Sequence, residues 1–168
     1  MENAISSILL IGLLIFGVMT VTSASMDSVD TLTASWKSLD TLENSIRNTS
    51  ITISSLDAAN GGGSLDLYLY NTGQQVLAEY EKWDVIVNYS SGEIQWIPYS
   101  SGTPGWQVSG ITIYTGGGSE VVDPGLLDPG EVAHMVIRFD PAVPKTQDQW
   151  VKVVVENGAS AQASFSWK

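Results

Sequence analysis

The chain has 168 residues, of which 18 are acidic and 7 are basic, and its formal net charge is -11. This balance argues against nucleic acid as a partner, because phosphate binding needs clustered Lys and Arg side chains. Cysteine is absent, which excludes disulfides and the zinc or redox sites that depend on thiolates.

An apolar run occupies residues 4–21, and no charged residue interrupts the chain between Glu2 and Asp27. A bilayer core about 30 Å thick requires about 20 mostly apolar helical residues, so the run is long enough to span a membrane. A secretory signal peptide, or an anchor with a positive cytoplasmic flank, would carry basic residues ahead of the run. The first basic residue is Lys37. We therefore expect either a plain N-terminal anchor or a mature chain that has lost a short basic leader and whose helix later leaves the membrane.

The same run predicts close packing between helices. Outside lipid its apolar surface cannot remain in water, because exposure costs about 25 cal/mol per Å². Packing many such helices together removes that cost, and small residues in the run allow a close approach. The predicted packing residues are Ile5, Ile8, Leu9, Ile11, Gly12, Leu13, Ile15, Phe16 and Val18.

The sequence after Val21 is more polar but keeps a helical pattern. Its apolar residues recur at spacings of three and four, which places them on one face of a helix. No Pro or Gly occurs between Val18 and Asn60. We predict one helix over about residues 3–47, roughly 65 Å long at about 1.5 Å per residue. The amphipathic half must lie against its own domain, a neighbouring helix or both, and its predicted stripe consists of Val29, Leu32, Trp36, Leu39 and Ile46.

The rest of the chain alternates between apolar and polar positions in the manner of β-strands. The clearest case is Leu65 to Tyr70, and turn sequences such as Asn157-Gly158 separate the strands. About seven to nine short strands with regular turns indicate an antiparallel sandwich or barrel. The other predicted strands begin near residue 51 and then cover residues 83–89, 93–99, 106–114, 131–139, 149–156 and 159–167.

These patterns predict an α+β chain in two parts. A hydrophobic and amphipathic helix covers residues 1–47, and an antiparallel β-sandwich covers residues 48–168. About 120 residues suit a single globular domain.

The sequence contains no arrangement typical of an enzyme. The single histidine, His134, lies on the predicted outer face of a strand, and no Gly-x-Ser-x-Gly elbow supplies a nucleophile. The Asp-Pro-Gly sequences at residues 123–125 and 128–130 are typical of turns and do not have the spacing of an EF-hand loop. We therefore predict no enzymatic activity, no cofactor and no metal site.

Two Asn-x-Ser/Thr sequons are candidate N-glycosylation sites. Asn48 lies at the predicted helix exit and Asn88 at the end of a predicted strand, and modification requires exposure in a suitable compartment. Asn48 can equally be a helix C-cap, and Asn88 can equally be a turn residue.

Three pieces of the sequence carry a family resemblance. They are the run Ile5 to Val21 that continues into a polar helix, the sequence Leu65-Asp66-Leu67-Tyr68-Leu69-Tyr70-Asn71-Thr72-Gly73, and the sequence Leu127-Asp128-Pro129-Gly130-Glu131 before a strand. On these pieces the chain resembles archaellins, the archaeal flagellins, and the sandwich-bearing accessory proteins of the archaellum, within the type IV pilus-like superfamily.

The resemblance implies a leader-processed subunit whose helices pack into a filament core and whose immunoglobulin-like β-sandwich is displayed outside. The expected partners are other copies of the chain in a helical filament, the cytoplasmic membrane before assembly, and a membrane-embedded assembly platform. The filament would lie outside the cell and serve motility or adhesion. The alternative is a membrane-anchored surface domain that binds a cell-envelope polymer or protein.

Overall fold

The structure is a computed structural model that describes residues 2–88, 93–114, 118, 125–145 and 149–166. The chain divides into two compact units, Met1–Glu43 and Asn44–Lys168. We call the second unit the β-domain. The domain boundary predicted between residues 47 and 48 stays a prediction.

The N-terminal helix α1 (Glu2–Asn48) is continuous over 47 residues, which confirms the single long helix expected from the sequence. Arg47 lies in its last turn, where a cation interacts favourably with the helix dipole. The helix gives way to extended chain at Thr49, whose backbone N–H donates to the carbonyl of Ile46 at 3.1 Å.

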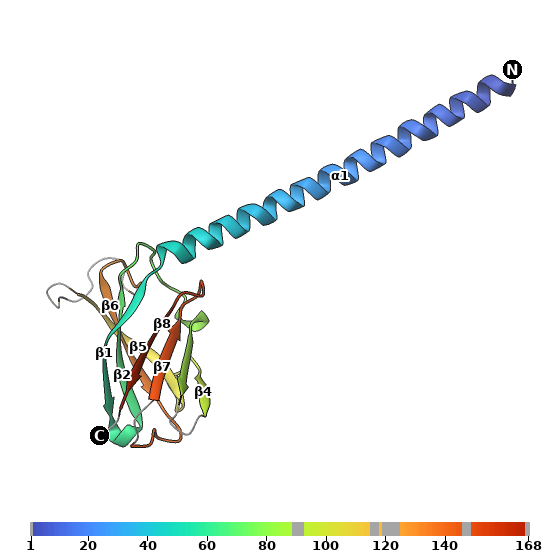
Figure 1. The fold of residues 1–168 in the computed structure, drawn as a ribbon. Helices are drawn as coiled ribbons and strands as arrows, with labels where there is room; N and C mark the ends of the chain where they lie inside the picture. Colours follow the sequence, from blue (N-terminus) through green and yellow to red (C-terminus); the bar gives the residue numbers. More distant parts are fainter. Residues whose placement is uncertain (1, 89–92, 115–117, 119–124, 146–148, 167–168) are drawn as a thin grey trace. The chain divides into compact units, whose positions relative to one another are not determined.

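The β-domain is a sandwich of two four-stranded antiparallel sheets (Figure 1). The first sheet has the order β1-β2-β6-β5, and the second has the order β4-β3-β7-β8. The α+β class and the sandwich expected from the sequence are therefore confirmed. The strands are β1 (Ile51–Ala59), β2 (Ser64–Asn71), β3 (Asp84–Asn88), β4 (Ile94–Ile97), β5 (Gly105–Ile113), β6 (Glu131–Arg138), β7 (Gln149–Val154) and β8 (Ser160–Phe165), with short 3-10 helices η1 (Asn60–Gly62) and η2 (Tyr80–Lys82).

The core lies between the sheets and follows the alternation of the strands. Every second residue of β2 and β6 points inward, so Leu67 on β2 and its pairing partner Met135 on β6 are both fully buried. Trp83 and Trp106 are also buried, and their rings stack with centroids 6.3 Å apart. Large aromatic side chains of this kind dominate core energetics, so the domain has a substantial core without disulfides.

Two β-bulges interrupt the outer strands of the first sheet. The register shifts between Ile53 and Ser55 in β1 and between Val108 and Gly110 in β5. A bulge leaves one residue unpaired and re-aims its side chain. The unpaired residues are therefore Ser54, whose hydroxyl donates to the carbonyl of Tyr68 at 3.0 Å, and Ser109.

We expect a fragment that begins at Asn44 to be soluble, monomeric and rich in β-structure. The clustered core of the β-domain begins at Ile51, and the exposed apolar half of α1 is absent from such a fragment. Circular dichroism and sedimentation equilibrium would measure this. An unfolded or mainly helical product would contradict the division of the chain into two independently stable parts.

Candidate assembly surface on the N-terminal helix

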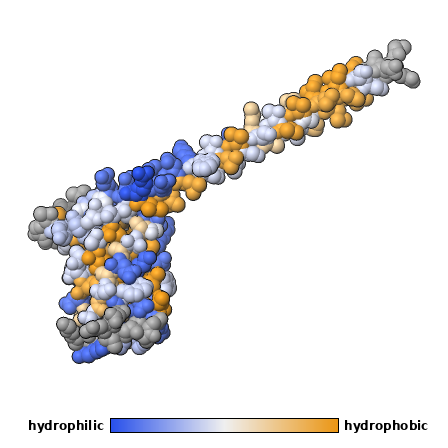
Figure 2. Space-filling model, in the orientation of Figure 1, coloured by the Kyte–Doolittle hydropathy of each residue, from blue (hydrophilic) through white to orange (hydrophobic). Residues whose placement is uncertain are grey.

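Every described side chain of α1 from Ile5 to Asn44 is exposed. The apolar members of the predicted packing set range from Ile11 at 55% exposed to Leu13 at 74%. Figure 2 shows the apolar side chains gathered along the N-terminal part of this helix. Monomeric soluble proteins rarely leave apolar patches this extensive in water, so this surface requires a covering of lipid or protein.

The apolar half of α1 is apolar on all sides. Leu9, Leu10 and Ile11 follow one another in sequence and are all more than half exposed. Because a helix makes one turn in about 3.6 residues, consecutive side chains point in different directions. Among the described residues, α1 is also the one helix long and apolar enough to cross a membrane. A helix that is apolar all round is suited to a bilayer or to the interior of a bundle.

Gly17 opens a groove along this surface. A Cβ placed on Gly17 would meet nothing within 4 Å, and the groove of about 430 Å³ is lined by Leu13, Leu14, Gly17, Val18, Val21 and Thr22. A second groove, of about 370 Å³, continues from Thr22 and extends to Asp30. Side chains of a neighbouring helix can enter such depressions, as knobs enter holes in packed helices.

Many hydroxyl groups of α1 bond to the helix itself. Each of eight Ser or Thr hydroxyls donates to the carbonyl oxygen four residues earlier, at 2.8 to 2.9 Å. This local bond satisfies the hydroxyl without an external partner. The residues are Thr20, Thr22, Ser25, Ser28, Thr31, Thr33, Ser35 and Thr41.

The predicted amphipathic stripe is exposed as well. Trp36 is 70% exposed, while Leu39 is 58% and Ile46 is 43% exposed. Val29 and Leu32 belong to the same face by their spacing and are similarly exposed. Its role as a contact between subunits stays a prediction.

Asn157, in the turn between β7 and β8, holds the end of α1. Its amide nitrogen donates to Thr49 Oγ1 at 2.6 Å and to Ser45 Oγ at 3.0 Å. Its amide oxygen accepts a hydrogen bond from the backbone of Ala159 at 3.1 Å. The turn at Asn157-Gly158 was predicted from the sequence, but its contact with residues more than 100 positions earlier was not.

The two β-domain sequences that carry the family resemblance meet at Asn71. This side chain is fully buried, and its amide nitrogen donates to the carbonyl of Leu127 at 2.9 Å. The carbonyl of Asn71 accepts from Gly130 at 2.9 Å. Directly after it, Thr72 and Gln74 donate to the backbone carbonyls of Ser50 and Asn48 at 2.9 and 2.8 Å. One buried asparagine therefore joins both sequences next to the segment that follows α1.

Comparison with known protein families matches residues 7–165 of the chain to archaeal-type flagellin. The chain belongs to the archaeal-type flagellin family. The matched span includes most of α1 and every strand of both sheets, which confirms the resemblance stated from the sequence. Members of this family are structural filament subunits.

Solved structures share the fold of this archaeal-type flagellin at low sequence identity. The archaellum periplasmic stator protein FlaG from Sulfolobus acidocaldarius is 20% identical with a TM-score of 0.55, and the match covers 70% of this chain and 99% of FlaG. The archaeal flagellum of Methanospirillum hungatei strain JF1 is 13% identical with a TM-score of 0.51, and the match covers 94% of this chain and 90% of the other. The second match covers more than the β-domain alone can supply, so it includes part of α1. No curated protein matches the sequence as a relative.

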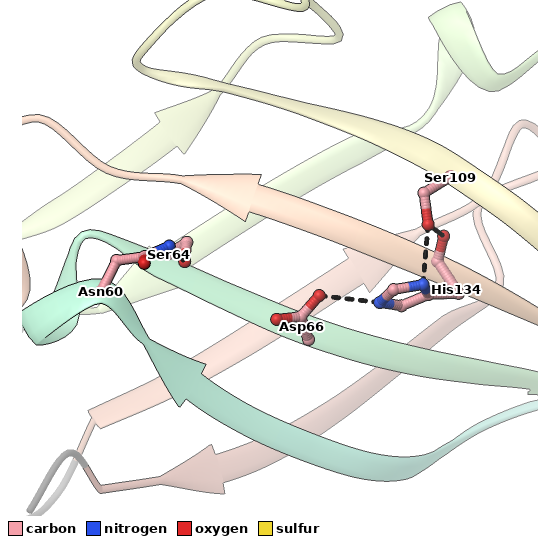
Figure 3. Close-up of polar contacts among 5 residues, drawn as sticks. All are labelled: Asn60, Ser64, Asp66, Ser109 and His134. Carbon is pink, nitrogen blue, oxygen red and sulfur yellow. Dashed lines mark hydrogen bonds and ion pairs between the residues drawn. The ribbon is translucent and has the colours of Figure 1, made fainter.

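The outer face of the first sheet of this flagellin carries a hydrogen-bonded chain of side chains that was not predicted from the sequence. Nε2 of His134 is 2.7 Å from Asp66 Oδ1 on β2, and Nδ1 is 2.7 Å from Ser109 Oγ in the β5 bulge (Figure 3). In a serine hydrolase the ring is used in the opposite order, with Nε2 toward the serine and Nδ1 toward the acid. The contacts instead connect three adjacent strands. No sequence pattern predicts these hydrogen bonds, because they depend on which strands become neighbours in the sheet.

The two sequons have different surroundings. The side chain of Asn48 is exposed at the last residue of α1, and Asn88 is half-buried at the end of β3. N-glycosylation at both positions stays a prediction. The other residues of the second sequon, Tyr89 and Ser90, lie outside the described part of the chain, as do residues 123 and 124 of the first predicted Asp-Pro-Gly turn and residue 167 of the last predicted strand.

Proposed function

We propose that this chain is the structural subunit of a helical archaellum-type filament that assembles through α1 and serves motility. The observation that carries the proposal is the apolar half of α1, where the described side chains from Ile5 onward are exposed and no charge occurs between Glu2 and Asp27. Membership of the archaeal-type flagellin family supports it. So does the fold shared with the flagellum of Methanospirillum hungatei over most of the chain.

Burial of apolar side chains supplies the driving force for assembly. Complete burial of a Val, Leu, Ile or Phe side chain gains about 1.5–3 kcal/mol, and the predicted packing set repeats in every subunit. An open helical polymer forms when one heterologous contact recurs without closing into a ring. The packing set Ile5, Ile8, Leu9, Ile11, Gly12, Leu13, Ile15, Phe16 and Val18 forms the filament core in this proposal.

The same helix provides the route to the filament. Its length and composition suit insertion in the cytoplasmic membrane before assembly. A membrane-embedded platform then transfers the subunit from lipid to the base of the growing filament. The β-domain, which carries its own core, lies outside the cell in the finished polymer.

Trp36→Ala tests the filament against a lone membrane anchor. In a filament we expect Trp36, which is 70% exposed in the subunit, to pack against a neighbouring helix. Loss of a buried Trp side chain typically costs about 3 to 5 kcal/mol, and the loss recurs in every subunit. The variant should therefore lower the melting temperature of filaments sheared from cells. It should leave the melting temperature of the β-domain in detergent-dissociated full-length subunits unchanged.

Ser35→Ala is the matched control, since Ser35 adjoins Trp36 and its hydroxyl donates to the carbonyl of Thr31 in its own helix at 2.9 Å. Electron microscopy of the sheared wild-type material comes first, and its filaments should contain this chain. A membrane-bound monomer with no filaments would favour the alternative, a surface domain that binds a cell-envelope polymer or protein. Equal melting temperatures of wild-type and Trp36→Ala filaments would contradict the proposal that the amphipathic stripe is a contact between subunits.

A further inference from the structure

The outer face of the second sheet carries an apolar patch on its edge strand β4. Ile94 is 61% exposed and Trp96 is 57% exposed. Their pairing partners on β3, Asn88 and Ile86, are half-buried on the same face. The indole Nε1 of Trp96 donates to Asp84 Oδ1 at 2.8 Å, which orients the ring on the surface. We call Ile86, Ile94 and Trp96 the Trp96 patch.

The outer face of the first sheet carries a depression of about 460 Å³. It is lined by Ser54, Ser55, Tyr68, Thr112, Ile113, Tyr114 and Val132, and we call it the tyrosine groove. Tyr114 stacks on Tyr70 with centroids 4.2 Å apart, and Tyr68 stacks on His134 with centroids 4.6 Å apart. These stacks restrict the ring positions, so the groove is built before anything enters it.

The charge of the chain limits where two copies can touch. At a net charge of -11, subunits repel one another through most of their surface, and close contact requires surfaces that carry little charge. No Asp, Glu, Lys or Arg lines the tyrosine groove. The three members of the Trp96 patch are uncharged, and the charged side chains beside them are of opposite sign: Asp84, which accepts from the Trp96 indole, and Lys152, the pairing partner of Ile86 on β7. The cores of protein interfaces are enriched in Trp and Tyr and depleted in most charged residues, and the two surfaces described here share this composition.

We propose that the Trp96 patch of one subunit occupies the tyrosine groove of the next copy of this chain. This inference rests on the proposed filament and adds a contact between β-domains to the contact made by α1. The two surfaces lie on the outer faces of different sheets, so one subunit can use both at once. A contact between different surfaces is heterologous and therefore propagates along a polymer.

Cysteine cross-linking tests the contact, because the chain has no cysteine of its own. Ile94→Cys places a thiol in the patch, and Thr112→Cys places one at the exposed edge of the groove. Filaments of the double variant, assembled under reducing conditions and then oxidised with copper phenanthroline, should give a ladder of trimers and longer products on non-reducing gels. Each single variant should give monomers.

Other patterns would overturn the inference. Dimers from Ile94→Cys alone would mean that the patch meets its own copy, and intact filaments without cross-links would mean that the surfaces do not meet. The control pair is Thr112→Cys with Ser160→Cys, which is exposed on the opposite edge strand β8, and a similar ladder from this pair would show unspecific collision. If the wild-type chain forms no filament at all, the proposed function fails before this contact is tested.

A labelling rate provides a second test that needs only one substitution. Reaction of Thr112→Cys with a fluorescent maleimide should be at least tenfold slower in filaments than in detergent-dissociated subunits. Ser160→Cys should react at similar rates in both. Equal rates for Thr112→Cys would overturn the contact and leave the groove open to a dissolved ligand such as a saccharide.

Discussion

Leu13→Lys should abolish filament assembly and leave the β-domain folded. Leu13 is 74% exposed in the subunit and lies beside the groove at Gly17, within a stretch that has no charge between Glu2 and Asp27. Assembly would bury the new ammonium group among apolar side chains without a partner. The effective cost of burying one unpaired charge is several kcal/mol, and every subunit of the polymer would incur it.

Electron microscopy of sheared material would measure assembly, and membrane fractionation would verify that the variant still enters the bilayer. Leu13→Met is the control for the position, because it keeps an apolar side chain of similar volume. Ser38→Lys is the control for the charge, because this half of α1 already contains Lys37 and Asp40. Ile11→Asp should act as Leu13→Lys does. Filaments of normal length from either apolar-to-charged variant would refute a helical core built from this run.

Gly73→Ala should destabilise the β-domain by about 3 kcal/mol, near the upper end of the usual cost of overpacking. A Cβ on Gly73 would lie 2.5 Å from the backbone nitrogen of Ser50 and 2.7 Å from the carbonyl oxygen of Asn48. Both atoms belong to the main chain and cannot rotate away. Relief of the clash must therefore disturb the hydrogen bonds that Thr72 and Gln74 donate to this segment.

Urea unfolding of the Asn44 fragment would measure this loss of stability. Gly110→Ala is the matched control, since a Cβ there meets nothing within 4 Å. A change below about 0.5 kcal/mol in Gly73→Ala, the range of ordinary surface substitutions, would show that the segment after α1 is free to move away from the turn at Gly73.

The elements of this fold were predictable because their signals are local. The length of α1 follows from an apolar run, a three-four spacing and the absence of helix breakers over adjacent residues. The strands follow from alternation, and the inward leucines of β2, such as Leu65 and Leu69, are fully buried as the pattern requires. Local patterns of this kind state which face of an element is apolar without reference to its neighbours.

The order of the strands and the contacts between them were not predictable in this way. Asn157 bonds to Ser45 across 112 positions, and His134 bonds to Asp66 across 68. Such pairs depend on which strands become adjacent, and their side chains are common types with no distinctive spacing. The β5 bulge at Ser109 does leave a trace, because Val108 and Ile111 both pair with inward residues of β6 although they lie three positions apart. That spacing does not identify the strand with which β5 pairs.

The apolar run also has a limit of a different kind. Leu9, Leu10 and Ile11 face different sides of the helix, and all three are exposed in the single subunit. The apolar run therefore predicts a helix that is covered on all sides by lipid or protein, but it does not show which side contacts a given neighbour. The individual packing residues therefore remain predictions that depend on the arrangement of neighbouring subunits.

The self-bonded hydroxyls of α1 have a thermodynamic consequence for the proposed route of the subunit. Thr20, Thr22 and Ser25 donate to carbonyls of their own helix, so none of them needs a new donor or acceptor when the surrounding medium changes from hydrocarbon to protein. For these groups the two media act as nearly equivalent solvents. The enthalpy of transferring α1 from the bilayer to the filament core then depends mainly on how closely its side chains pack against their surroundings. The helix can leave the lipid and enter the filament without first breaking hydrogen bonds of these hydroxyl groups.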